Sequence, residues 1–298
     1  MPSSTSEKVY VIGATGNIGI KVVNSLLARE VSTTIYVRDV EKSRALFASS
    51  TNASTHLTFV QGDYADLSAF KSSIAGHNRL FLLVADVENM PTIKQDLGTI
   101  AYSAGVKQIV DLSSRFALLD WRTSFIGESH RLAEERLYQL ALQHGGTVVS
   151  LRPSRFFTNH TWTKGALTHL NAVVDCHPSD LKVEYISIDD IADVATVVLT
   201  DPIEKHQSRA YTLIGDSVDG VTRASYFGQI LNKPIVYKQV SPQELVDTMV
   251  KSDSPWPLAY DMATVDTTRA PTDAVPILLG RPYETLESWV LKNKELFV

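Results

Sequence analysis

The chain has 298 residues, of which 44% are apolar and 20% charged, and its formal net charge at pH 7 is −5. These fractions are those of an ordinary globular protein and exclude global disorder. The dispersed Lys and Arg exclude the basic surface of a nucleic-acid-binding protein, and no apolar run approaches the ~20 residues that a membrane-spanning helix needs.

The amino-terminal segment and the cysteine count indicate the compartment. Residues 1–7 are short of apolar side chains and lack the core of a secretion signal. The single cysteine, Cys176, excludes an internal disulfide and a thiolate metal site. We therefore expect a cytoplasmic protein, monomeric or homodimeric, that acts on a small molecule and binds no metal, nucleic acid or membrane.

Short β-branched strands alternate with helical segments through the first half of the chain. The predicted strands are 8–13, 33–37, 57–60, 79–85, 108–112 and 147–151. The predicted helices are 17–29, 41–48, 67–74, 90–104 and 128–143. Apolar strands separated by helices are typical of a parallel sheet that is covered on both faces. We predict a doubly wound α/β (Rossmann) fold whose first domain comprises residues 1–153.

The pattern changes after Arg152-Pro153. A loop rich in aromatic and small polar residues covers 154–178, and it is followed by predicted strands at 182–188 and 209–214 with a helix at 190–199. Further helices are predicted near 222–231, 242–250 and 283–294. We predict a smaller, mostly helical substrate-binding lobe at residues 154–298, from which the strand at 182–188 returns to the main sheet.

A glycine-rich turn follows the first predicted strand. Its residues are Gly13, Ala14, Thr15, Gly16, Asn17, Ile18 and Gly19. Gly13 permits the tight turn, Gly16 lets the backbone approach a pyrophosphate, and Gly19 lets the helix pack closely on the strand. We expect these seven residues to hold the phosphates of a dinucleotide.

The end of the second strand indicates which dinucleotide binds. A carboxylate at this position binds the ribose hydroxyls of NAD, whereas an arginine accommodates the 2′-phosphate of NADP. Arg38 ends the strand and Lys42 follows one helical turn later, so the sequence favours NADP(H). Asp39, one residue further on, leaves NAD as the alternative.

The third and fourth strand ends complete the predicted cofactor site. Asp63 and Tyr64 follow the third strand, where the adenine edge is expected, and Val84 and Ala85 end the fourth, beside the nicotinamide ribose. Both assignments rest on the rule that ligands of parallel sheets bind at the carboxyl ends of the strands.

Several motifs stand at strand ends along the first 200 residues. They are the glycine-rich turn, Val37-Arg38, Gly62-Asp63-Tyr64, Asp111-Leu112-Ser113-Ser114, Arg152-Pro153-Ser154-Arg155-Phe156 and Ile188-Asp189-Asp190-Ile191-Ala192, with weaker matches at 241–242 and 279–282. Together they resemble the NmrA-like branch of the atypical short-chain dehydrogenases. The resemblance implies a Rossmann fold, an NADP preference, a cofactor contact at Ser154 and a substrate cleft between the sheet and the carboxyl-terminal lobe. This family includes quinone-oxidoreductase-like and secondary-metabolite reductases as well as redox-sensing regulators.

The usual catalytic pair of short-chain dehydrogenases is missing from the sequence. In that pair a tyrosine donates a proton, and a lysine four residues later lowers the pKa of the tyrosine. No tyrosine here has a lysine at this spacing, and residues 108–163 contain no lysine. The sequence therefore predicts a reaction without a Tyr/Lys pair.

Four other residues are the catalytic candidates. His130 resembles the family residue that replaces the lysine, and Glu134 shares its helical face, so the carboxylate is predicted to orient the imidazole or raise its pKa. The alternative is a solvated histidine in an ion pair. Ser113 and Ser114 end the fifth strand and are expected to direct a hydroxyl at the substrate, with a turn cap as the alternative. Asp111 interrupts a buried strand and is either an acid/base group or part of a structural ion pair.

Aromatic side chains gather in two loops that follow strands. Such a cluster suits a flat, largely apolar or aromatic substrate. The expected substrate residues are Phe116, Trp121, Phe125, Phe156, Phe157 and Trp162, to which the family resemblance adds Asn159.

These features favour an NADPH-dependent oxidoreductase of secondary metabolism that reduces an electrophilic conjugated or aromatic molecule, such as an iminium, enone or quinone. Alignment of the nicotinamide with the acceptor would supply most of the catalysis, with the proton coming from water, His130 or a serine hydroxyl. Two alternatives remain: a non-catalytic NADP-sensing regulator, and a non-redox cyclase or isomerase on the same fold.

Overall fold

The computed structural model describes residues 7–298, which form two compact units. The first unit comprises residues up to 118 together with 127–152 and 191–211, and the second comprises 119–126, 153–190 and 212–298. The predicted division into 1–153 and 154–298 misses the return of residues 191–211 to the first unit. No helix in the described residues is long and apolar enough to cross a membrane.

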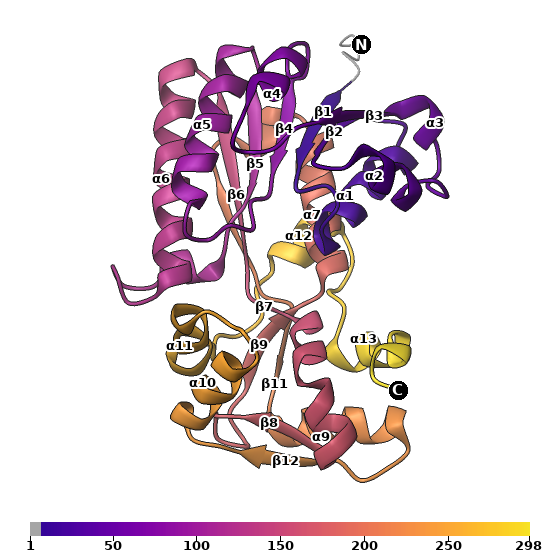
Figure 1. The fold of residues 1–298 in the computed structure, drawn as a ribbon, viewed down its shortest axis with the longest axis vertical. Coiled ribbons are helices and arrows are strands. Elements are labelled where there is room, and N and C mark those ends of the chain that lie inside the picture. Colours follow the sequence, from indigo (N-terminus) through magenta and orange to yellow (C-terminus); the bar gives the residue numbers. More distant parts are fainter. Residues whose placement is uncertain (1–6) are drawn as a thin grey trace. The chain divides into compact units, whose positions relative to one another are not determined.

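The first unit is built on a seven-stranded sheet of order β10-β6-β5-β4-β1-β2-β3 (Figure 1). Its strands are β1 (Lys8–Ile12), β2 (Ser32–Val37), β3 (Leu57–Gln61), β4 (Arg79–Leu82), β5 (Gln108–Leu112), β6 (Thr147–Pro153) and β10 (Ala210–Leu213). All pairs from β3 to β6 are parallel, which confirms the predicted Rossmann fold. The strand order reverses beside β1, and in such sheets a ligand binds at this reversal.

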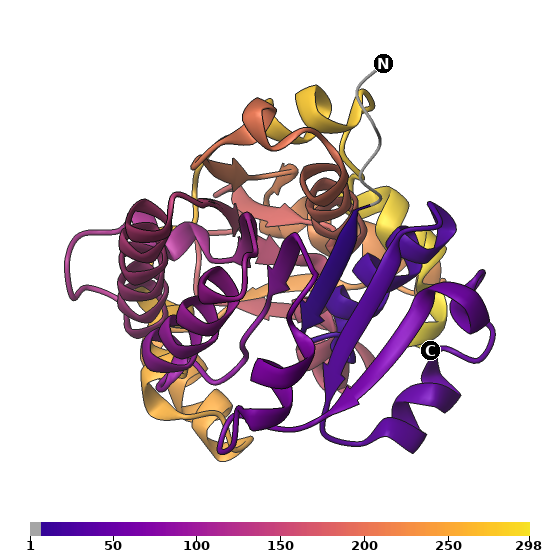
Figure 2. The ribbon, with the colours of Figure 1, turned by 90° about the horizontal axis from the view of Figure 1, so that it is seen from above.

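Helices cover both faces of this sheet. They are α1 (Asn17–Ala28), α2 (Val40–Leu46), α3 (Ala53–His56), α4 (Ser68–Ser73), α5 (Met90–Ser103), α6 (Phe125–His144), α7 (Ile188–Thr200) and α8 (Ile203–His206). Tyr10 and Ile12 share one apolar cluster with α4, α5 and α6. Side chains alternate along a strand, so Val9 and Val11 point to the opposite face, where α1 packs. Figures 1 and 2 show α5 and α6 side by side.

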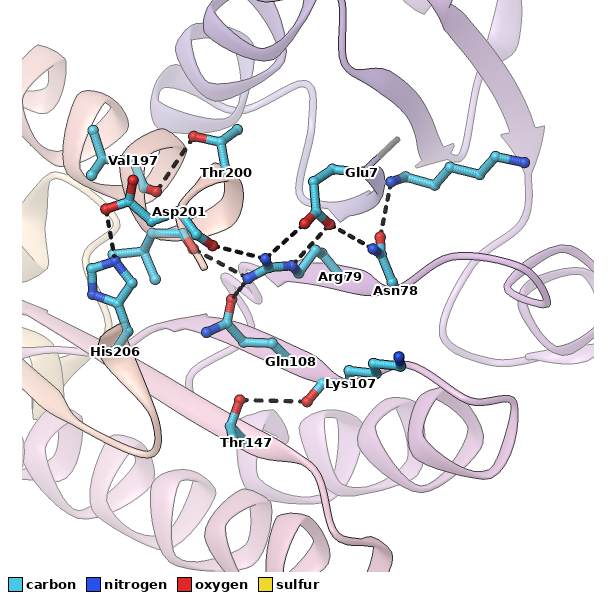
Figure 3. Close-up of polar contacts among 12 residues, drawn as sticks. Glu7, Asn78, Arg79, Lys107, Gln108, Thr147, Val197, Thr200, Asp201 and His206 are labelled. Atoms are coloured by element: carbon cyan, nitrogen blue, oxygen red, sulfur yellow. Dashed lines mark hydrogen bonds and ion pairs between the residues drawn. The ribbon is translucent and has the colours of Figure 1, made fainter. Parts of the chain in front are cut away.

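A buried arginine contacts the segment that returns to the first unit after residue 190. Arg79 starts β4 and is 1% exposed. Its guanidinium donates to the Glu7 carboxylate (2.9 Å) and to the Asp201 carbonyl (2.8 Å), and it also contacts Gln108 at the start of β5 (Figure 3). The Glu7 carboxylate neutralises this buried charge, and the residue after α7 adds a carbonyl that accepts a further hydrogen bond from it.

The second unit contains two small sheets that the sequence did not predict. One has the order β11-β9-β7 and consists of β7 (Arg155–Phe156), β9 (Val183–Ile186) and β11 (Asp216–Val218). The other pairs β8 (Ala172–Asp175) with β12 (Val236–Gln239). The prediction that the strand at 182–188 returns to the main sheet was wrong, because β10 joins that sheet instead. Both segments are short apolar strands, and their pattern does not say which edge each will join.

Helices make up most of the remaining second unit, as predicted. They are α9 (Gly220–Leu231), α10 (Pro242–Lys251), α11 (Trp256–Thr264), α12 (Ala274–Leu279) and α13 (Leu286–Lys292), with short turns η2 (Phe157–Thr163), η3 (Ala166–Leu170) and η4 (Lys294–Leu296). Phe157, Tyr185, Phe227 and Trp289 form the centre of its core. Two of the family motifs meet here, because the Arg281 guanidinium lies 2.7 Å from the buried Asp190 carboxylate.

Candidate functional site

Two glycines of the turn between β1 and α1 are required by the backbone itself. Gly13 has a φ of +80°, and a Cβ there would lie 2.6 Å from the Leu83 carbonyl oxygen. A Cβ on Gly19 would lie 2.1 Å from the Gly13 carbonyl oxygen. A side chain at Gly13 would clash with Leu83 beyond β4, and one at Gly19 would push α1 away from the turn.

Gly16 differs, because neither its backbone conformation nor its surroundings in the protein require a glycine there. A Cβ at this position would come no closer than 3.5 Å to another atom, and its φ of −80° suits any residue. Gly16 is the N-cap of α1, no side chain caps this helix, and Thr15 and Asn17 beside it are exposed. The first amides of α1 therefore open outward with the positive end of the helix dipole, which fits a pyrophosphate. Ala14 and Ile18 are buried and offer only backbone groups.

The groups after β2 are one carboxylate that already has a partner and two exposed cations. Asp39 is the N-cap of α2, and its carboxylate accepts a hydrogen bond from the Lys42 amide at 2.9 Å. This carboxylate is thus engaged by its own helix, whereas the Arg38 and Lys42 side chains are exposed. Burial raises the pKa of Tyr64, and the nearby charge of Arg38 opposes the shift.

The turn after β3 and the end of β4 are held by hydrogen bonds. The Asp63 carboxylate accepts from the Ala65 amide at 2.8 Å, and the Tyr36 hydroxyl donates to the Asp63 carbonyl at 2.9 Å. The Asp63 carboxylate therefore shapes the turn, while Tyr64 is 38% exposed and available to a ligand. At the fourth strand end the Val84 side chain is buried and Ala85 is exposed, so Val84 offers only its backbone.

A fully buried ion pair lies at the carboxyl end of β5. The Lys94 ammonium on α5 is 2.5 Å from one Asp111 carboxylate oxygen and 2.9 Å from the Leu112 carbonyl oxygen. Both side chains are 0% exposed, and the second Asp111 oxygen has no hydrogen-bond partner within residues 7–298. Burial raises the pKa of Asp111, and the Lys94 charge opposes this only in part. Asp111 therefore forms a buried ion pair, and an acid/base role for it stays a prediction.

Lys94 is the site residue that the sequence analysis missed. It follows Met90 by four residues and precedes Leu97 by three, and both of these are buried. A lysine on the apolar stripe of a helix requires a buried partner, so this spacing was the available signal. The partner, Asp111, lies on the neighbouring strand β5, and the sequence of the helix does not identify it.

The two serines after β5 and Glu134 hold the local structure together. The Ser113 hydroxyl donates to the Glu134 carboxylate, which also receives the Arg152 guanidinium, with Arg152 Nε at 2.9 Å from Oε1. The Ser114 hydroxyl accepts from the Phe116 amide at 3.1 Å, so it caps the short turn η1 (Arg115–Leu118). Both hydroxyls therefore already have partners within the protein.

His130 does not pair with Glu134, contrary to the prediction. Its Nδ1 is buried and makes no hydrogen bond to any described residue. Burial lowers the pKa of His130 well below 6.5, and the charge of Lys94 lowers it further. The predicted rise was wrong because Glu134 is engaged by Ser113 and Arg152. The imidazole is neutral at neutral pH, and it lies beside a buried cation.

The predicted substrate residues divide into exposed and buried ones. Phe157 is 0% exposed in the core of the second unit, which rules it out as a substrate contact. Phe116 is also buried, whereas Trp121 is 68% and Trp162 is 67% exposed. Phe125, Phe156 and Asn159 are partly buried. The Ser154 hydroxyl is buried without a hydrogen-bond partner in the described chain.

In the described residues, one cluster of side chains has the residue types and spacing of a metal site. Its carboxylate is already held in ion pairs within the protein. Asp175, Cys176 and His177 place their ligand atoms within 4.8 Å of one another. The Asp175 carboxylate is bound by the Arg223 guanidinium at 2.9 Å and by His177 Nδ1 at 2.8 Å. The hydrogen bond to Asp175 raises the pKa of His177 to about 9. Two cations thus already neutralise this carboxylate, and a metal ion would have to displace one of them.

Comparison with known proteins agrees with the family resemblance of the motifs. A family model described as NAD(P)H-binding matches residues 13–202. The chain is 24% identical to an NAD(P)H azoreductase of Xenophilus azovorans, over 97% of this chain and 99% of that protein. It is 26% identical to quinone oxidoreductase 2 of Escherichia coli, over 87% of this chain and 86% of that protein. The crystal structure of Citrobacter triphenylmethane reductase complexed with NADP(H) has a TM-score of 0.78 at 23% identity, covering 96% of this chain and 99% of that one.

The two kinds of glycine in the turn predict different effects of the same methyl group. Gly16→Ala adds a Cβ that meets only ligand space, so we expect an unchanged fold and at least tenfold weaker NADPH binding, equal to about 1.4 kcal/mol. Gly19→Ala places its Cβ against the Gly13 carbonyl and should lower the free energy of unfolding by about 1–3 kcal/mol. Fluorescence titration with NADPH and urea unfolding measure the two effects. Wild-type NADPH affinity in Gly16→Ala would contradict the assignment.

The Lys94 charge predicts how His130 titrates. In the double variant Lys94→Met/Asp111→Asn the buried charges are gone, and we expect the pKa of His130 to rise toward 6.5 but to stay below it, because burial remains. NMR titration of the His130 imidazole measures this, with the exposed His144 on the same helix as internal reference. In the wild type the unfolded chain binds the His130 proton and the folded chain does not, so stability decreases as pH falls below 6.5. Identical His130 titrations in the two proteins would show that Lys94 has no influence.

Proposed function

Because the chain belongs to the NAD(P)H-binding family, we propose that it is an NADPH-dependent reductase of electrophilic, conjugated aromatic acceptors. The observation that carries the proposal is the open turn at Gly16, where the first amides of α1 meet no protein side chain. The azoreductase and quinone oxidoreductase relatives support the same chemistry, since an azo group and a quinone both accept a hydride without prior activation. The protein is thus an NAD(P)H-dependent oxidoreductase, and its location in the cytoplasm and its place in secondary metabolism remain predictions.

NADPH is favoured over NADH by the groups after β2. The Asp39 carboxylate, which would bind the ribose hydroxyls of NADH, accepts the Lys42 amide instead. The exposed side chains of Arg38 and Lys42 can then neutralise a 2′-phosphate. Tyr64 offers a partly exposed ring for the adenine edge of the cofactor.

The polar cluster at the end of β5 favours acceptors that need no protonation before reduction. Bound NADPH supplies the hydride. His130 is neutral and therefore a weak acid, and the Ser113 proton is held by Glu134. The protein would act mainly by aligning the acceptor, which can contribute several kcal/mol, while His130 donates a hydrogen bond rather than a proton. Aryl azo compounds, quinones and triarylmethane cations fit this requirement.

The proposed reaction is tested with purified protein, NADPH and a panel of one quinone, one aryl azo dye and one triarylmethane dye. We expect NADPH consumption that matches acceptor loss for at least one class, because each is electrophilic enough to take the hydride directly. Nicotinamide absorbance and dye decolourisation are followed together, with the binding-deficient Gly16→Ala variant as the background. Tight NADPH binding without turnover of any acceptor would instead indicate a sensor.

The cofactor preference is tested at the cation pair. Arg38→Ala/Lys42→Ala should weaken NADPH binding at least tenfold, or about 1.4 kcal/mol, and leave NADH binding unchanged, because only NADPH carries the 2′-phosphate. The matched control is Arg44→Ala on the same helix α2, whose side chain is 59% exposed and pairs with Glu41. An unchanged ratio of the two affinities in the double variant would remove the argument for NADPH.

A further inference from the structure

The second unit carries a surface hollow of about 410 Å³ beside the edge strand β11. Its lining comes from the residue before β9, from β11, from the segment 268–271 and from Tyr283. All of these residues belong to the second unit, whereas the glycine-rich turn belongs to the first. A hollow of this size falls in the range of small-molecule sites, so the groups that line it indicate what it can bind.

The segment 268–271, which forms one wall of the hollow, is fixed by hydrogen bonds at two points. The Ser217 hydroxyl of β11 donates to the Arg269 carbonyl at 2.8 Å. Just beyond the segment, the Thr272 amide donates to the Ile214 carbonyl at 3.0 Å. The wall is thus formed before any ligand binds, which reduces the entropy cost of binding.

Three hydrogen-bond donors in this lining have no hydrogen-bond or ion-pair partner among residues 7–298. They are the Lys182 ammonium, the Arg269 guanidinium and the Tyr283 hydroxyl. Lys182 and Arg269 are exposed, and Tyr283 is half-buried. Burial raises the pKa of Tyr283, and the Asp216 carboxylate raises it further, so the hydroxyl keeps its proton and can donate. A lining that offers free donors of this kind, two of them charged, suits an anion.

The one carboxylate in the lining limits how much negative charge a ligand can carry. Asp216 accepts hydrogen bonds from the Ser217 amide at 2.8 Å and the Leu286 amide at 2.9 Å, so the backbone holds it in place. Two cations and this carboxylate leave one positive charge in excess. The Asp219 carboxylate, which caps α9, also interacts with the charge of Lys182 and reduces the excess. The balance therefore favours a single negative charge over a dianion such as a phosphate monoester.

We propose that this hollow binds a small aromatic monocarboxylate. The Arg269 guanidinium and the Lys182 ammonium bind the carboxylate, because a guanidinium matches its two oxygens, and the Tyr283 hydroxyl donates a further hydrogen bond. The apolar part of the lining, Ala270, Pro271 and the Tyr283 ring, contacts the ring of the ligand. This site goes beyond the proposed reduction and does not depend on it, since none of its residues belongs to the cofactor turn.

The test measures benzoate binding to the full-length protein by isothermal titration calorimetry, without NADPH. In Lys182→Gln/Arg269→Gln we expect at least tenfold weaker benzoate binding, because both charges that hold the carboxylate are gone. Tyr283→Phe keeps the ring and loses the hydroxyl, and it should weaken benzoate binding about fivefold. Added salt should weaken benzoate binding to the wild type, since the cations are exposed. For the same reason the double variant should keep the wild-type thermal unfolding midpoint.

The matched control variant is Lys251→Gln on α10, which removes an exposed cation of the second unit outside the hollow. It should leave the benzoate affinity unchanged. Benzyl alcohol, which has the same ring without the charge, and inorganic phosphate should both bind more weakly than benzoate. Equal benzoate affinities in the wild type and the double variant would overturn the inference. No binding of benzoate to the wild type, or tighter binding of inorganic phosphate than of benzoate, would also overturn it.

Discussion

The buried ion pair between Lys94 and Asp111 is the interaction on which the candidate site depends. Taking two charges out of water costs several kcal/mol, and a 2.5 Å contact together with the Leu112 carbonyl offsets this cost only if the geometry is kept. The pair therefore adds little net stability. Its effect is to hold α5 against the end of β5, at the edge of the sheet where parallel strands present their ligand-binding groups.

The same ion pair determines the chemistry available around it. Burial disfavours a positive charge on His130, and the nearby Lys94 ammonium disfavours it further, so His130 stays neutral. Ser113, Glu134 and Arg152 satisfy one another, which leaves no acidic hydroxyl or free carboxylate in this group. This is the basis for proposing hydride transfer to an acceptor that is already electrophilic. A carbonyl that must be protonated as it is reduced is disfavoured under the same proposal.

The aromatic residues of the second unit show that an aromatic-rich segment does not by itself identify substrate contacts. The loop after β6 is rich in aromatic side chains, yet Phe157 completes the core with Tyr185 and Trp289. The exposed Trp256 and Tyr260 on α11 lie in a region where the sequence predicted only irregular structure between two helices. The sequence does not distinguish an exposed aromatic side chain from a buried one, because the residue types are the same. Only the packing of the chain determines which of them is exposed to solvent.

Local geometry made much of this protein predictable. The turn from Gly13 to Gly19, the strand segments and most helix boundaries depend on residues close together in the chain, so the sequence pattern predicts them. The partner of Lys94, the carbonyl that binds Arg79 and the sheet that β9 joins were decided only by the tertiary structure. Each of these depends on which elements lie side by side. A buried charge or a strand edge needs a partner, but the local sequence does not specify which element provides it. The sequence by itself thus determined the fold and the cofactor turn, while the packing of distant elements determined the charge state of the site.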